Sequence, residues 1–171
     1  MTVPDRELVG RFIDAVVEDP SAAQALLALH PELRDARWIH RETPLHFLAV
    51  EGYLEGVRWL AAHGFDLNTP NDFGDTALVE AASLGQLDMV QLLLSLGANP
   101  NAASMVHGSA LLAAVNSISL PTVQALVSAG AAPVLPEIHE RLLRVRMELD
   151  RNDRDVLLPL LRIAFPQVNF D

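Results

Sequence analysis

The stretch Thr43-Pro44-Leu45-His46 decides the fold, because it opens a pattern that returns twice, each time after 33 residues. Chance does not keep five separate columns of similar residues in register over three units. The columns are Thr43/Thr76/Ser109, Leu45/Leu78/Leu111, Val57/Val90/Val123, Leu60/Leu93/Leu126 and Gly64/Gly97/Gly130. A fixed period of this length is typical of repeat proteins, in which each unit buries its apolar side against its neighbours.

Within one unit, the sequence predicts two helices followed by an extended loop. Thr43 suits the N-cap of the first helix, and Pro44 suits its first position. Gly52 is expected to end this short helix, and a second helix is predicted over 54–62. Gly64 is expected to stop the second helix, because glycine adopts positive φ without strain.

The third unit departs from this pattern at the turn between its helices. Ile118 stands where the two earlier units have Gly52 and Gly85, so we expect this turn to be built differently. Pro121 follows at a position where it can open the second helix of the unit.

The repeating unit closely resembles the ankyrin repeat. Residues 43–46 have the Thr-Pro-Leu-His start of that family, and Ala81-Ala82 with Gly85 match the middle of its unit. Residues 97–101, Gly-Ala-Asn-Pro-Asn, match its exit loop with two changes. The resemblance implies an all-α solenoid of stacked helix-turn-helix units with extended loops. It also implies that His46 braces backbone groups.

The whole chain is expected to form a single ankyrin-repeat domain. Residues 37–69, 70–102 and 103–134 are the three full repeats. Residues 1–36 follow the period loosely and are predicted to be a degenerate N-terminal repeat. Residues 135–171 depart further and are predicted to be a C-terminal helical cap, because the end of a solenoid must present a polar face to water.

Composition limits the possible functions. Half of the 171 residues are hydrophobic and only 5% are aromatic, so the core must be mainly Leu, Ala and Val. We expect no secretory signal and no membrane span, and the cytoplasm is the expected compartment. The chain has no cysteine, which excludes disulfides and thiolate chemistry. Its net charge of −10 argues against a nucleic-acid partner.

A search for catalytic groups finds none that suit a reaction. His30 and His63 occupy equivalent positions in adjacent units, about 10 Å apart, which is too far for a shared metal ion. The glycines punctuate the repeat rather than forming a phosphate loop, and no serine has the setting of a nucleophile. We therefore expect no enzyme activity, no metal ion and no cofactor.

The resemblance implies a protein partner that meets the loop tips and the neighbouring face of the first helices. Each unit contributes residues at the same offsets, and the row contains apolar members in every unit. Apolar side chains fringed by acids are typical of a protein interface. The alternative is that the apolar tips fold back onto the first helices. The predicted binding residues are Ile39, His40, Glu42, Val50, Glu51, Asp72, Phe73, Asp75, Ser83, Leu84, Met105, Val106, Asn116 and Ser117.

The distribution of charge leaves two function classes open. Residues 59–136 contain five acids and no Arg or Lys, so Asp72, Asp75 and Glu80 are expected to join Glu42 and Glu51 in an unneutralised acidic row. Such a row would attract a partner with a basic surface. The protein is then either a monomeric interaction module or scaffold, or an inhibitor or immunity protein that neutralises a basic bacterial toxin or effector enzyme.

Overall fold

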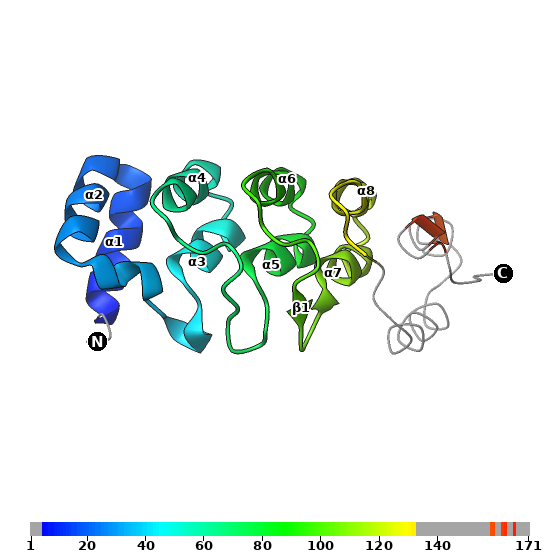
Figure 1. Cartoon of the computed structure of the whole chain (residues 1–171), viewed down its shortest axis with the longest axis horizontal. Helices are drawn as coiled ribbons and strands as arrows, with labels where there is room; N and C mark the ends of the chain where they lie inside the picture. Colours follow the sequence, from blue (N-terminus) through cyan, green and yellow to red (C-terminus); the bar gives the residue numbers. More distant parts are fainter. Residues whose placement is uncertain (1–4, 133–157, 160–161, 164–165, 167–171) are drawn as a thin grey trace.

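The computed structural model describes residues 5–132, 158–159, 162–163 and 166. Within these ranges the chain forms pairs of antiparallel helices that stand side by side along one axis (Figure 1). The helix pairs are α1 (Arg6–Glu18) with α2 (Pro20–Leu29), α3 (Pro44–Val50) with α4 (Leu54–Ala62), α5 (Ala77–Ser83) with α6 (Leu87–Ser95), and α7 (Ala110–Asn116) with α8 (Leu120–Ser128). Two short 3-10 helices, η1 (Pro31–Asp35) and η2 (Ile39–Arg41), link the first pair to the second.

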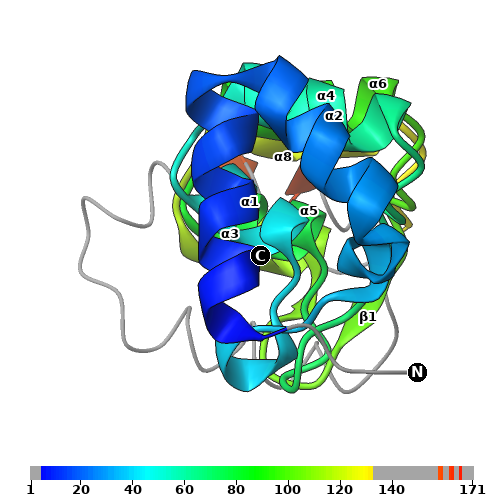
Figure 2. The same cartoon turned by 90° about the vertical axis from the view of Figure 1, so that its left-hand side faces the viewer.

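The helices lie in two layers with the loop tips on one side. Viewed along the array, α4, α6 and α8 superpose in one layer, and the tips project below the layer that holds α3 and α5 (Figure 2). This arrangement confirms the predicted all-α solenoid. The described strands are β1 (Ala103–Ser104) and β2 (Gly108–Ser109), which pair antiparallel within the third tip. The described helices include none long and apolar enough to cross a membrane.

The repeat columns form the core, as the period predicted. Leu45, Leu78, Leu93 and Leu126 are each at most 1% exposed. The N-terminal pair supplies the same core with larger side chains, since Phe12 is fully buried and stacks on Phe65 with ring centroids 5.8 Å apart. Each pair therefore buries its apolar side against the next pair, which is the source of stability in a solenoid.

The start of α3 shows how the first helices are fixed. Thr43 caps the helix by accepting a hydrogen bond from the backbone N–H of His46 at 3.3 Å. His46 returns the bond, because its Nδ1 accepts from the backbone N–H of Thr43 at 3.2 Å. Its Nε2 then donates to the backbone carbonyl of Asp75 in the next repeat at 3.0 Å. His46 therefore braces backbone groups in two repeats, as the resemblance implied.

The turn in the third unit corrects one prediction. Ile118 adopts a φ of 55°, close to the 78° and 67° of Gly52 and Gly85 at the same repeat position. The turn is thus built in the same way as the others, without the glycine that would make it unstrained. The same two backbone bonds close it, from the Ile118 N–H to the Val115 carbonyl and from the Ser119 N–H to the Ala114 carbonyl, and they hold a β-branched residue in a conformation that it rarely adopts. The predicted C-terminal cap of residues 135–171 lies almost entirely outside the described residues.

Candidate protein-binding surface

The loop tips are joined to one another by backbone hydrogen bonds. The N–H of Asp72 donates to the carbonyl of His40 at 2.9 Å, and the N–H of Met105 donates to the carbonyl of Phe73 at 3.1 Å. Gly74 allows the second contact, because a Cβ at this position would lie 3.1 Å from the Met105 nitrogen. Successive tips therefore form one continuous edge rather than independent loops.

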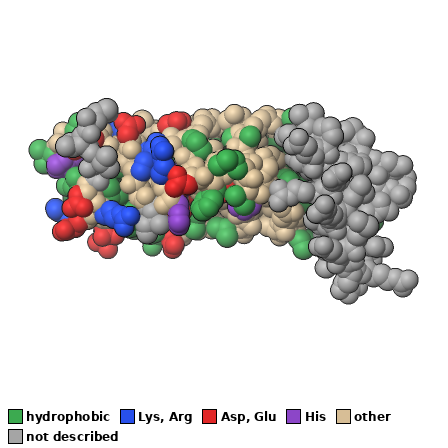
Figure 3. Space-filling model, turned by 90° about the horizontal axis from the view of Figure 1, so that it is seen from below, with side chains coloured by type: hydrophobic (Ala, Val, Ile, Leu, Met, Phe, Trp, Pro, Cys, Tyr) green, Lys and Arg blue, Asp and Glu red, His purple; other side chains and the backbone are tan. Residues whose placement is uncertain are grey.

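The apolar tip residues whose side chains the structure describes are exposed, as a binding surface at the tips requires. Phe73 is 42% exposed, Met105 76% and Val106 46%. Figure 3 shows the face that carries the tips: hydrophobic side chains gather midway along it, between charged residues of both signs on one side and the undescribed part of the chain on the other. At the far ends of the first helices, Val50 and Leu84 are also exposed.

Several polar residues of the predicted surface take part in contacts of their own. His40 is exposed, and its ring centroid lies 5.4 Å from that of Phe73. The hydroxyl of Ser83 donates to the carbonyl of Glu80, and the hydroxyl of Ser117 donates to the carbonyl of Ala82. The two serines are thus half-buried and bonded to backbone. Glu51 and Asn116 are exposed and Glu42 is half-buried, whereas the side chain of Ile39 lies outside the described residues.

The expectation that Asp75 lies on the exposed surface is wrong. Asp75 is 3% exposed, and both of its carboxylate oxygens accept from Nδ1 of His107, at 3.0 and 2.9 Å. The bond crosses from the second tip to the third, so a residue from the next repeat covers this carboxylate. Asp75 therefore holds the tips together and is not available to a partner.

The predicted acidic row is also weaker than its sequence suggests. Arg41, from the preceding tip, places Nε 3.9 Å from a carboxylate oxygen of Asp72, so this acid does have a local positive neighbour. Burial, together with the nearby carboxylates of Glu42 and Asp75, raises the pKa of Glu80 to about 7, although a hydrogen bond from Asn71 acts in the opposite direction. Near neutral pH, Glu80 thus carries only part of its charge.

Asn71 is a structural residue of the surface that the sequence did not reveal. It is buried, and its side-chain oxygen accepts from the backbone N–H groups of Phe73 and Asp75 at 2.9 and 3.0 Å. Its amide group donates to Glu80 at 2.8 Å, which sets the orientation of the side chain. Asn71 thus fixes the loop that presents Phe73. The Asn-Asp-Phe-Gly sequence of residues 71–74 could have indicated this role, because an Asn side chain in a turn often bonds the backbone two residues further along.

The buried histidine does not have the character of a catalytic base. Burial lowers the pKa of His46, and its two ring nitrogens are both used by backbone groups and the Thr43 side chain. The imidazole therefore stays neutral near pH 7 and has a structural role. In the described part of the chain, no group of three or more His, Asp or Glu side chains is placed to hold a metal ion.

Comparison with known proteins agrees with this architecture. A family model described as "Ankyrin repeats (3 copies)" matches residues 12–104. Over 68 residues the chain is 38% identical to a probable E3 ubiquitin-protein ligase, XBOS32, of Oryza sativa subsp. japonica. It is 40% identical over 68 residues to the E3 ubiquitin-protein ligase XBAT32 of Arabidopsis thaliana. Each match covers 39% of this chain but only 14% and 13% of the two plant proteins.

Proposed function

The chain belongs to the ankyrin-repeat family, and on that premise we propose that it is a non-catalytic interaction module that binds a protein partner through its loop tips and first-helix face. The observation that carries this proposal is the exposure of Phe73 and Met105 on tips whose backbones are bonded to each other. Exposed aromatic and Met side chains are enriched at the centres of protein interfaces. Because the backbone hydrogen bonds already hold the tips in place, the loops lose less conformational entropy when a partner binds.

The two plant ligases support a shared scaffold rather than a shared reaction. Each match spans 68 residues, less than a sixth of the relative's length. Ligase activity is therefore no part of the proposed function. The proposal takes from these relatives only that a segment of similar sequence occurs within larger proteins.

A second candidate function is an inhibitor or immunity protein that neutralises a basic toxin or effector enzyme. The net charge of −10 favours this candidate, as does the absence of Arg and Lys from residue 59 to residue 136. Attraction to a basic partner depends on salt, because counter-ions screen exposed charges beyond about 8–10 Å at ordinary ionic strength. An association rate that falls steeply with salt would favour the inhibitor, and a rate that salt leaves unchanged would favour the general module.

The proposal is tested by capturing the partner from the native cells and measuring its affinity for variants. Phe73→Ala is expected to weaken binding by about 2 kcal/mol, or roughly thirtyfold, if Phe73 is a central anchor. The matched control is Leu29→Ala, which removes an even more exposed apolar side chain from α2, away from the tips. Equal effects of the two variants, or a larger effect of the control, would place the interface elsewhere.

A further inference from the structure

The loop of the second tip is tied to one ionisable side chain, that of Glu80 on α5. The side-chain oxygen of Asn71 accepts from the backbone N–H groups of Phe73 and Asp75 at 2.9 and 3.0 Å. The amide nitrogen of the same Asn71 donates to Oε1 of Glu80 at 2.8 Å. Because the amide cannot turn without breaking one of these contacts, the position of the Glu80 carboxyl group affects the backbone that carries Phe73.

The other oxygen of the Glu80 carboxyl group has no partner. Oε2 is buried and accepts no hydrogen bond from the described residues. A proton on this carboxyl group removes the negative charge, whereas ionisation leaves a charge whose one printed donor is the Asn71 amide. An unpaired buried charge costs much more free energy than an unpaired neutral group. The ionised carboxylate is therefore poorly accommodated in this position.

Two further carboxylates lie near Glu80 and disfavour its ionisation. Glu42 is half-buried before α3, and Asp75 is buried before α5. Burial is the largest cause and these two negative charges add to it, so that together they raise the pKa of Glu80 to about 7 against the hydrogen bond from Asn71. Glu80 is thus mainly protonated below neutral pH and mainly ionised above it.

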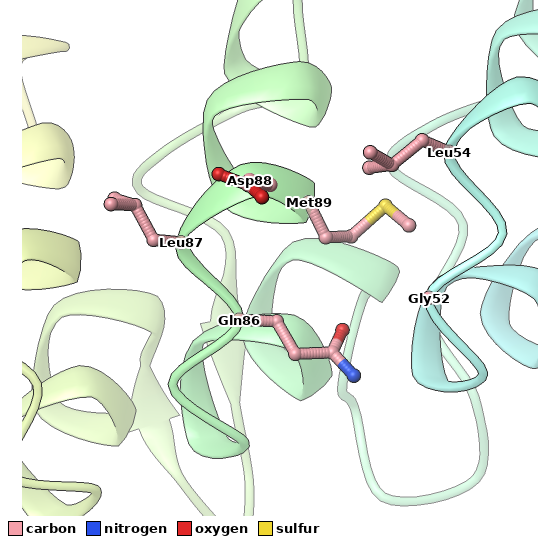
Figure 4. Close-up of a pocket in the computed structure, with 6 residues that line it drawn as sticks. All are labelled: Gly52, Leu54, Gln86, Leu87, Asp88 and Met89. Carbon is pink, nitrogen blue, oxygen red and sulfur yellow. The ribbon is translucent and has the colours of Figure 1, made fainter.

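The helices packed against α5 bring no arginine to this cluster. α3 has His46 as its only ionisable side chain, a buried imidazole that bonds the carbonyl of Asp75. α7 has no ionisable side chain, and α6 has only Asp88, which lies at the turn end of the helices beside a groove next to Gly52 (Figure 4). His107, from the loop before α7, is engaged with the carboxylate of Asp75.

The arginines of the segment between η1 and α3 are engaged elsewhere. Arg37 donates to two nearby backbone carbonyls at 3.0 and 3.1 Å. Arg41 is exposed, and its Nε lies 3.9 Å from a carboxylate oxygen of Asp72. None of the ion pairs in the described part of the chain includes Glu80, so its negative charge has no salt-bridge partner there.

This arrangement connects a proton to the binding surface. We infer that Glu80 is a pH-dependent switch of the tip surface, which holds the second tip in place when protonated and releases it when ionised. The ionised side chain gains hydration by turning toward water, and this movement breaks its bond to Asn71. Asn71 then loses the contact that orients its amide, and the loop that presents Phe73 becomes less ordered. The surface therefore binds its partner more tightly below neutral pH than above it.

The inference concerns regulation of the surface proposed above, and it rests on that proposal only for the step at the partner. The first test therefore uses protons alone, on the full chain without a partner. NMR spectra between pH 5 and pH 8 record the carboxyl carbon of Glu80 and the backbone amides of residues 71–75. Both are expected to change together, with a midpoint of about 7.

Two variants assign this transition to its group. Glu80→Gln keeps an oxygen that accepts from Asn71 and carries no charge, so it should remove the transition from the tip amides. His107→Gln is the control, because histidine ordinarily titrates in the same pH range. It removes the imidazole that bonds Asp75 and should leave the transition of the Glu80 carboxyl carbon and the tip amides in place.

The second test measures the affinity for a partner captured from the native cells at pH 6 and at pH 8. When only the protonated form presents the surface, the competent fraction falls from about nine-tenths to about one-tenth, so the wild-type affinity should fall by up to about tenfold. Glu80→Gln should show none of this loss. Any titration of the partner itself affects both proteins equally, so the difference between them isolates Glu80.

Three results would overturn the inference. They are tip amides that do not follow the Glu80 carboxyl carbon, a transition near pH 7 that is unchanged in Glu80→Gln, and an equal loss of affinity in the wild type and in Glu80→Gln. Each of them leaves the proposed function intact as long as Phe73→Ala weakens binding. Conversely, loss of the Phe73→Ala effect on a captured partner would remove the proposed function and leave the titration of the tip standing.

Discussion

The carboxylate of Asp75 and the imidazole of His107 are bonded at 2.9 Å, although 32 residues separate them in the chain. Asp75 is almost completely buried, whereas His107 remains one-third exposed. The pair closes the gap between the second and third tips at the point where Met105 bonds Phe73. Its first consequence is for stability rather than for binding.

Replacing His107 with Gln is expected to lower the free energy of unfolding by about 1–3 kcal/mol, because it weakens the side-chain bond to the buried carboxylate of Asp75. Urea unfolding measures the loss. A double-mutant cycle with Asp75→Asn should show strong coupling between the two positions. His30→Gln, at a more exposed histidine that also bonds a carboxylate, is the control, and additive effects in the cycle would contradict the pairing.

Glu80 predicts an unusual dependence of stability on pH. Its pKa is raised to about 7 in the folded state, so the folded protein holds a proton that the unfolded chain releases above about pH 4.5. The contribution of this group to stability is therefore lost as the pH rises from about 4.5 through about 7, and it changes little above that. Glu80→Gln removes this penalty and should raise the free energy of unfolding at pH 8 by roughly 1–3 kcal/mol.

The same substitution should have little effect at pH 5, where Glu80 is protonated in the folded state. Urea unfolding at the two pH values tests the difference. Glu55→Gln is the control, since that side chain is exposed and should give the same small change at both pH values. A gain from Glu80→Gln that is as large at pH 5 as at pH 8 would show that repacking rather than charge is responsible.

Ile118→Gly is expected to stabilise the protein by about 1 kcal/mol, because glycine adopts a φ of 55° without the steric cost that a β-branched residue carries. Part of the gain is offset by the greater freedom of glycine in the unfolded chain. Thermal unfolding measures the balance. Gly85→Ala at the equivalent turn should destabilise, and the opposite order of the two variants would mean that Ile118 is not strained.

Leu78→Ala should lower the free energy of unfolding by about 2–5 kcal/mol, through lost burial and the cavity left behind. Leu78 is 1% exposed and lies in the centre of the array. Leu84→Ala removes the same group from an exposed position six residues later, so it should change stability much less. Similar urea midpoints for the two variants would contradict the assigned register of α5.

The repeat columns were predictable because a solenoid imposes the same environment every 33 residues. Leu78 is buried for the reason that Leu45 and Leu111 are buried, so one position predicts the others. The ends of α4 at Leu54 and Ala62 were predicted for the same reason, with Gly64 following as the stop signal. Properties that repeat with the period can be read from the sequence.

Properties that depend on a contact between unlike positions could not be predicted in this way. Asp75 has Glu42 and Gly108 as its equivalents, so nothing in its column indicated a buried carboxylate. Its partner His107 aligns with Arg41 and Gly74; Arg41 contacts only the exposed Asp72, and glycine has no side chain to bond a carboxylate. The strain at Ile118 was missed because the absent glycine suggested a different turn, whereas the chain keeps the same turn hydrogen bonds and Ile118 takes the positive φ.

The backbone hydrogen bonds between tips determine which insertions and deletions of residues the fold can accept. Both bonds join residues 32 positions apart, from His40 to Asp72 and from Phe73 to Met105. Duplication or excision of a whole 33-residue segment brings an equivalent donor opposite each acceptor. An insertion of one residue within a tip instead displaces the donor from its carbonyl. The register of these bonds therefore accepts the gain or loss of one full repeat and is broken by smaller changes. Duplication of a whole repeat is thus an easier way to enlarge the surface than insertion of residues within a tip.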